Sequence, residues 1–233
     1  MRRILALGFI LIGLCSLIPA TSHAETEATI VQVPPQIVML IPANAFRDEE
    51  FELPYKIFAS HATVTVASTR LGPIDGMMGL KANAEIFVKD IDVDKLDGLV
   101  LVGGVGARQY WRDPAVHRLV REVVAKEKVL AAICIAPVTL AYSGVLKGKN
   151  ATVFVSERGR LIQEGARYTG KDLTVDGLII TASGPKFAQV FGERVLRMVL
   201  AEHRKRYEAA LKAAKEAAER AAASEQNTTE EVE

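Results

Sequence analysis

The hydrophobic pattern of the chain alternates between two kinds of segment. Continuous apolar runs of strand length occur at residues 37–41, 98–102 and 129–133. Amphipathic stretches lie between them; Phe51 and Phe58, for example, flank Tyr55 at spacings of four and three, which predicts a helix. Continuous apolar strands that alternate with amphipathic helices are typical of a parallel sheet covered on both faces. The pattern therefore predicts an α/β domain.

Other segments extend this order along the chain. The Asp176-Gly177 pair predicts a turn between two short strands, and Gly184-Pro185 opens a last core helix through about residue 200. The remaining predicted elements are strands at 63–67 and 151–155, a turn-rich hairpin at 72–79, a helix at 114–126 and a helix after Cys134.

The two ends of the chain differ from this core. Residues 202–223 are alanine-rich and charged, with pairs such as Glu208 and Lys212 at helical spacing. This stretch predicts a solvated helical extension, followed by a disordered acidic tail at 224–233. Since its large apolar residues are few, a coiled-coil partner role is the weaker alternative.

Residues 1–24 have the pattern of a signal peptide. A basic start precedes an apolar run at 4–18, and Ser22-His23-Ala24 supplies the small residues of a cleavage site. The run is shorter than the roughly 20 residues of a membrane span, although a retained N-terminal anchor is an alternative. We expect cleavage, a periplasmic or secreted protein, and a short lead segment at 25–36.

Charge and cysteine content narrow the class of partner. The formal net charge is +1 and no large basic patch occurs, which excludes nucleic acid and anionic membranes as expected partners. Cleavage would leave Cys134 as the single cysteine, so no internal disulfide could form. A lone thiol in an oxidising compartment is expected either to be buried or to have a chemical function.

Cys134 lies at a predicted strand-to-helix corner. An apolar run leads into it, and Ala136-Pro137 has the pattern of a first helical turn. There the helix dipole and free N–H groups would favour a thiolate; the alternative is a small buried hydrophobic residue. Residues 42–50 and 103–106 also follow strands, and the carboxyl ends of parallel strands are where ligands bind. We expect these three segments to converge.

Five segments in order resemble the ThiJ/PfpI family, which includes the Parkinson-disease-associated deglycase. They are residues 43–54, 96–104, 131–137, 143–152 and 176–185. The resemblance implies a flavodoxin-like three-layer sandwich of the class I glutamine amidotransferase type over residues 37–201. It also implies a homodimer and chemistry without a metal or organic cofactor.

The resemblance assigns roles to four residues. Cys134 matches the family's nucleophile, and Glu50 matches the glutamate whose carboxyl meets the sulfur. The backbone N–H groups of Gly104 and Ile135 would hold an oxyanion. Because an ionised carboxylate would repel a thiolate, Glu50 is expected to be protonated. The alternatives are a solvated Glu50 in a first helical turn and a Gly103-Gly104 pair that only makes a tight turn.

The chain departs from the family at its histidines. Ile135 stands where peptidase and amidotransferase relatives have histidine, and Phe154 stands where the deglycase branch has a second one. His61, His117 and His203 lie on no matching motif. A peptidase or amidase is therefore the least favoured function.

Three functional hypotheses remain. The first is glyoxalase-like or deglycase-like action of Cys134 and Glu50 on a small electrophile. The second is a redox-sensing or stress-protective protein in which an oxidant reversibly oxidises Cys134. The third is a pseudoenzyme whose C-terminal helix binds a partner.

Overall fold

Strand β7 (Val129–Ile133) lies near the middle of a seven-stranded sheet in a computed structural model that describes residues 33–230, with side chains through residue 220. The strand order is β10-β11-β7-β6-β1-β2-β5. All neighbours pair in parallel except the edge strand β10, which is antiparallel to β11. The other strands of this sheet are β1 (Gln36–Leu40), β2 (Thr63–Ser68), β5 (Ile86–Phe87), β6 (Gly98–Leu101), β10 (Leu173–Asp176) and β11 (Ile179–Ala182).

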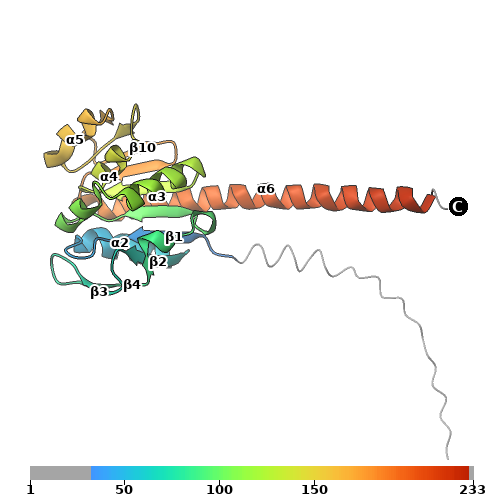
Figure 1. The fold of residues 1–233 in the computed structure, drawn as a ribbon, viewed down its shortest axis with the longest axis horizontal. Helices are drawn as coiled ribbons and strands as arrows, with labels where there is room; N and C mark the ends of the chain where they lie inside the picture. The colour runs from blue at the N-terminus through green and yellow to red at the C-terminus, as the bar shows by residue number, and fades with distance from the viewer. Residues whose placement is uncertain (1–32, 231–233) are drawn as a thin grey trace, which may run out of the picture. The chain divides into compact units, whose positions relative to one another are not determined.

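Helices cover both faces of the sheet, as the continuous apolar strands require (Figure 1). Alternate strand residues enter different cores. Ile37 and Met39 pack in a core that includes side chains of α2 (Asp48–Ala59) and α6 (Ala188–Glu230). Val38 and Leu40 pack in the core that contains side chains of α3 (Pro114–Ala125), α4 (Pro137–Tyr142) and α5 (Arg158–Gln163). This is the predicted three-layer α/β fold.

Two small sheets lie beside the main one. The hairpin of β3 (Gly72–Asp75) and β4 (Lys81–Ala84) confirms the turn prediction at 72–79. The strand predicted at 151–155 is wrong in extent, since only β8 (Asn150–Ala151) forms and pairs with β9 (Arg167–Tyr168). The chain leaves β8 at once because the N–H groups of the residues that follow donate to the main sheet and to the residue after β7 instead of to β9. Phe154 donates to the Cys134 carbonyl, and Thr152 donates to Thr181 Oγ1.

The last core helix and the predicted extension are one helix. α6 runs unbroken from Ala188 to Glu230, past the predicted start of a disordered tail at residue 224. Its early part packs against α2, β7 and β11. Beyond Tyr207, the described side chains through residue 220 are mostly exposed, as the alanine-rich composition predicts.

The start of the extension is anchored, which corrects the prediction of a solvated segment from residue 202. Asp97, which directly precedes β6, is 8% exposed. Its carboxylate accepts the Gln36 N–H at 2.8 Å, His203 Nδ1 at 3.1 Å and Arg206 Nη2. Each N–H donor satisfies part of the buried charge. This Asp97 anchor ties α6 to the start of β1.

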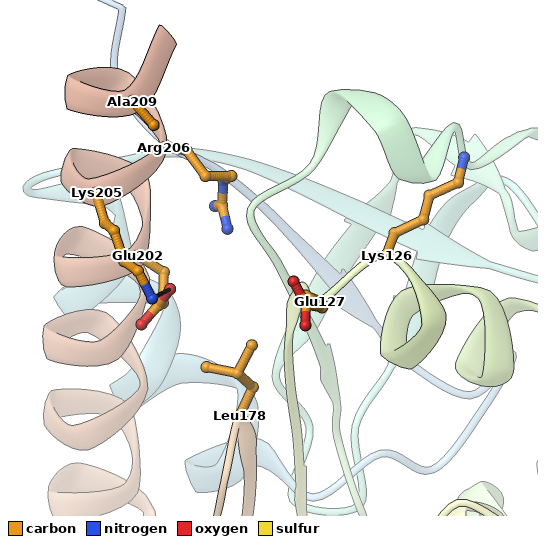
Figure 2. Close-up of a pocket in the computed structure, with 7 residues that line it drawn as sticks. All are labelled: Lys126, Glu127, Leu178, Glu202, Lys205, Arg206 and Ala209. Carbon is orange, nitrogen blue, oxygen red and sulfur yellow. Dashed lines mark ion pairs between the residues drawn. The ribbon is translucent and has the colours of Figure 1, made fainter. Parts of the chain in front are cut away.

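A groove of about 320 Å³ lies next to this anchor (Figure 2). Figure 2 shows α6 along one side and the turn before β7 along the other. Lys126 and Glu127 precede β7, and Leu178 precedes β11, so the groove is at the amino ends of parallel strands. Ligand sites of such sheets lie at the opposite edge. The predicted chemistry must therefore be sought at the carboxyl end of β7.

The ends of the chain limit two further predictions. The signal peptide at 1–24 and most of the lead segment at 25–36 lie outside the described residues. Within the described part of the chain, no helix combines the length and the apolar character that crossing a bilayer requires.

Candidate active site

Cys134 is the first residue after β7 and confirms the predicted strand-to-helix corner. Its φ of 62° is in the left-handed region, which is strained for a residue with a side chain. Two backbone hydrogen bonds hold this conformation: the Cys134 N–H donates to Ala182 at 2.9 Å, and its carbonyl accepts from Phe154 at 2.8 Å. The corner points the sulfur out of the sheet. The cysteine remains 8% exposed.

Glu50 reaches the sulfur from the first turn of α2. Its side chain is fully buried, and neither carboxyl oxygen makes a hydrogen bond of good geometry among the described residues. The Cys134 thiol and the Gly103 N–H nevertheless lie close enough to act on its charge. The alternative of a solvated Glu50 is therefore wrong.

A second acidic residue fixes the loop that carries Glu50. Asp48 is buried, and its carboxylate accepts the N–H groups of Met78 and Leu80, both at 2.8 Å. These amides belong to the turn between β3 and β4. The hairpin thus holds the first turn of α2 in place.

The two glycines after β6 make close approach possible. A Cβ on Gly103 would lie 2.4 Å from Glu50 Oε2 and 2.7 Å from the Cys134 Cβ, distances that no side chain tolerates. Gly104 has φ 96°, and its Cβ would lie 2.4 Å from the Arg47 nitrogen. Segments 42–50, 103–106 and Cys134 therefore converge, as predicted from their strand ends.

Burial keeps protons on both acidic groups of the site. It raises the pKa of Glu50 to about 8, against smaller opposing effects of the Cys134 thiol and the Arg47 charge. Burial, and then the charge of an ionised Glu50, raise the pKa of Cys134 to about 12. The N–H groups of Gly104 and Ile135 both act on the sulfur in the opposite direction. Glu50 is accordingly protonated at neutral pH.

Burial opposes the thiolate that the corner predicts, because it raises the pKa of Cys134. Helix α4 has only six residues, so its dipole offers the sulfur little compensation for lost hydration. The raised pKa contains a contribution from an ionised Glu50. With Glu50 protonated, that repulsion is absent and the two N–H groups favour the thiolate.

Comparison with known proteins identifies the family of this chain. A profile of the DJ-1/PfpI family matches residues 36–198, which include Glu50, both glycines and Cys134. The chain belongs to the DJ-1/PfpI family.

Relatives within the DJ-1/PfpI family cover most of the domain. The uncharacterized protein MJ0967 of Methanocaldococcus jannaschii is 37% identical over 85% of this chain and 98% of its own length. Deglycase PfpI of Pyrococcus furiosus is 28% identical over 64% of this chain and 90% of its own. The glutathione-independent glyoxalase DJ-1 of Schizosaccharomyces pombe is 28% identical over 70% of this chain and 90% of its own.

A solved structure agrees with the fold. The ThiJ/PfpI domain protein from Brachyspira murdochii superposes with a TM-score of 0.71 at 26% identity, covering 72% of this chain and 98% of that one. The predicted family and fold class are thereby confirmed.

The described histidines of this DJ-1/PfpI member hydrogen-bond to groups other than the Cys134 sulfur. His61 bonds Ser60, His117 bonds the Trp111 carbonyl, and His203 bonds Asp97. In the part of the chain with described side chains, no histidine is hydrogen-bonded to Cys134, and no group of three or more His, Cys, Asp or Glu converges as metal ligands. Among the described residues, Glu50 is the titratable group next to the Cys134 sulfur.

The sequence did not lead us to predict the short helix that follows Gly104. A 3₁₀ helix, Val105–Tyr110, follows Gly104, and Trp111 caps it. The Trp111 indole donates to the Ile135 carbonyl at 3.3 Å. The signal was available: Val105, Arg108 and Trp111 recur every third residue, the period that shares one face of a 3₁₀ helix.

Proposed function

We propose that this protein is a glyoxalase-like or deglycase-like enzyme that acts on small α-oxoaldehydes through Cys134 and Glu50. The observation that carries this proposal is the fully buried Glu50 carboxyl facing the sulfur, with the Gly104 and Ile135 N–H groups next to the same sulfur. Relatives named as a deglycase and as a glyoxalase support the reaction class. The individual roles are part of the proposal.

The reaction begins with attack of the Cys134 sulfur on the aldehyde carbon. A C–S bond forms, and the carbonyl π pair moves to oxygen, where the N–H groups of Gly104 and Ile135 hold the negative charge. Glu50 supplies the proton that neutralises this oxygen. No group other than the neighbouring carboxyl is needed for the transfer.

The ionised Glu50 then removes the hydrogen on the same carbon as a proton and returns it to the adjacent carbonyl carbon, while the hydroxyl proton on the first carbon passes to the oxygen of the second. The first carbon is oxidised to a thioester and the second is reduced to an alcohol. The electrons balance within the substrate. Water hydrolyses the thioester, which releases a 2-hydroxy acid and restores the thiol.

The proton inventory predicts how activity depends on pH. At neutral pH, Glu50 and the Cys134 thiol together hold two protons. The form that attacks the substrate has lost one of them and shares the other between the carboxyl and the sulfur. Since the first proton leaves with a pKa of about 8, kcat/KM should rise as pH increases through that value. A flat profile between pH 6 and 9 would contradict the assignment.

Turnover of methylglyoxal to lactate, followed by proton NMR, tests the proposal. The wild-type protein should form lactate, Cys134→Ala should form none, and Glu50→Gln should be slower by about 100-fold or more. Ser60→Ala, on the far end of α2, is a matched control with unchanged turnover. Equal rates in wild type and Cys134→Ala would exclude cysteine chemistry.

A redox-sensing role is the second candidate, and the unpartnered Glu50 oxygens favour it. A sulfinic acid at Cys134 would bring oxygens that the protonated Glu50 could donate to, with the two N–H groups as further donors. Peroxide should then add two oxygen atoms to Cys134, read by peptide mass, without oxoaldehyde turnover. Loss of this product in Glu50→Asp would support the contact.

Export and self-association complete the proposal. The N-terminal pattern at 1–24 supports cleavage after Ala24 and a periplasmic or secreted location, and the family resemblance supports a homodimer. N-terminal sequencing of the protein recovered from its native cell tests the first. Light scattering of the purified chain tests the second.

A further inference from the structure

Two partly exposed guanidinium groups, those of Arg108 and Arg160, pack against the ring of Trp111. Arg108 Cζ lies 5.5 Å from the centre of the Trp111 ring, and Arg160 Cζ lies 4.9 Å from it. Trp111 itself is bonded to Ile135, whose N–H acts on the sulfur. Both guanidinium groups therefore pack on the ring whose N–H donates to the carbonyl of Ile135, the residue after Cys134.

One buried carboxylate is shared between them. Glu157 accepts Arg160 Nε at 2.7 Å, and Arg160 Nη1 donates to the Tyr142 hydroxyl at 3.1 Å. Arg108 Nη2 is 3.8 Å from Glu157, beyond hydrogen-bond distance. One carboxylate thus faces two guanidiniums, and a third, that of Arg112, lies 5.1 Å from the centre of the Tyr142 ring, so the cluster carries an excess of positive charge.

Arg108 is the more exposed and the less tightly paired of the two guanidinium groups. Its side chain is 62% exposed, and among the described residues its guanidinium makes no hydrogen bond. Val105, one 3₁₀ turn earlier on the same face, is 53% exposed and directly follows Gly104. The face thus offers a short apolar surface next to the oxyanion donor and then a planar cation.

We propose that Arg108 binds the carboxylate of the substrate, and that the preferred substrates are short aliphatic α-oxoaldehydes that end in a carboxylate. The assignment of a reacting aldehyde rests on the proposed function. The planar fork of an arginine matches the two oxygens of a carboxylate. Trp111 and Arg160 position Arg108, while Arg108 itself touches substrate.

Alkylation of Cys134 tests the anion site without any turnover. The second-order rate constants with anionic iodoacetate and neutral iodoacetamide are measured on the full chain at pH 7 by peptide mass. N-acetylcysteine is the free-thiol reference. We expect the iodoacetate-to-iodoacetamide ratio at Cys134 to exceed the reference ratio by about 10-fold.

Two variants separate a local effect from a general charge effect. Arg108→Gln should return the ratio to near the free-thiol value. Arg118→Gln removes an equal charge from an exposed position on α3 and should leave the ratio unchanged. A wild-type ratio equal to the reference, or a ratio unchanged in Arg108→Gln, would overturn the site.

The substrate class is tested with 4,5-dioxopentanoate and its methyl ester. The acid should have a kcat/KM about 10-fold above that of the ester, and Arg108→Gln should remove this preference through KM with kcat nearly unchanged. Equal loss on acid and ester would overturn the carboxylate contact. Absence of oxoaldehyde turnover with a retained iodoacetate preference would reject the proposed function while supporting the anion site.

Discussion

Two buried carboxyl groups at opposite ends of the parallel strands have pKa values shifted in opposite directions. Glu50, at the carboxyl ends of the strands, has no hydrogen bond of good geometry among the described residues, and burial raises its pKa to about 8. Asp97, at the amino ends, is held by Gln36, His203 and Arg206. Despite the opposing effect of burial, the pKa of Asp97 is lowered.

The difference shows that partners, rather than burial, decide the charge of a buried acid. Three N–H donors, two of them on side chains that can carry positive charge, keep Asp97 ionised as a structural anchor. Glu50 lacks such donors and therefore keeps a proton that can be moved. A buried carboxyl group is thus an ionised structural contact at the amino ends of the strands and a protonated group without such donors at their carboxyl ends.

Gly103→Ala should break the reactive edge most severely. The new Cβ would meet Glu50 Oε2 at 2.4 Å and the Ile133 carbonyl oxygen, a backbone atom, at 2.8 Å. We expect a loss of about 3 kcal/mol in the free energy of unfolding and at least about 100-fold in kcat/KM. Gly159→Ala is the matched control, because nothing lies within 4 Å of its Cβ. Urea titration and turnover assays measure both effects, and an active, stable Gly103→Ala would refute the close contact.

Asp97→Asn should weaken the structural edge by about 2 kcal/mol at pH 7, because it removes charge-assisted hydrogen bonds. A lowered folded pKa means that this stability is present above the unfolded value of about 3.9 and is lost as pH falls through the folded value. The difference between wild type and variant should therefore shrink in acid. Urea midpoints at pH 3 and pH 7 measure it, and turnover should stay near the wild-type value.

Glu50→Gln should change the pH dependence of stability in the reverse sense. The wild-type carboxyl is protonated when folded and ionised when unfolded between about pH 4.3 and its folded pKa of about 8. Wild-type stability falls as pH rises through that window, by up to about 1.4 kcal/mol per pH unit from this group. The variant lacks this slope, so its melting temperature should gain on wild type from pH 5 to pH 8. Parallel curves would show that Glu50 is ionised when folded.

Arg206→Gln should have the smallest effect, about 1 kcal/mol, because Asp97 keeps its contacts with Gln36 and His203. Arg204→Gln, an exposed neighbour on α6, should stay within about 0.5 kcal/mol. Thermal unfolding of the two variants makes the comparison. Equal stabilities would remove Arg206 from the anchor.

The fold and the centre of the site were predictable because they depend on local patterns. Continuous apolar runs gave the parallel strands, and the corner at Cys134 followed from a strand that meets Ala136-Pro137. The protonated state of Glu50 followed from the repulsion between two like charges. Each of these arguments uses residues that are close in sequence or that follow strand ends.

The remaining features could not be predicted because they depend on contacts between residues that are far apart in the sequence. Asp97 and Arg206 are 109 residues apart, and no pattern in either segment announces their contact. The raised pKa of Cys134 depends on burial, which the sequence of the corner does not show. The shortened strand at β8 reflects the hydrogen bond from Phe154 to Cys134, a competitor that apolar periodicity cannot reveal.

Asp48 joins the turn that carries Glu50 to a distant hairpin, and this has a consequence for hydrogen exchange. The Met78 and Leu80 amides, 30 and 32 residues from Asp48, are protected by its carboxylate rather than by a strand partner. They exchange with solvent only when the first turn of α2 releases them. A ligand that steadies Glu50 against Cys134 should therefore slow exchange at these two amides. Their deuterium uptake reports occupancy of the site even for a compound that is never turned over.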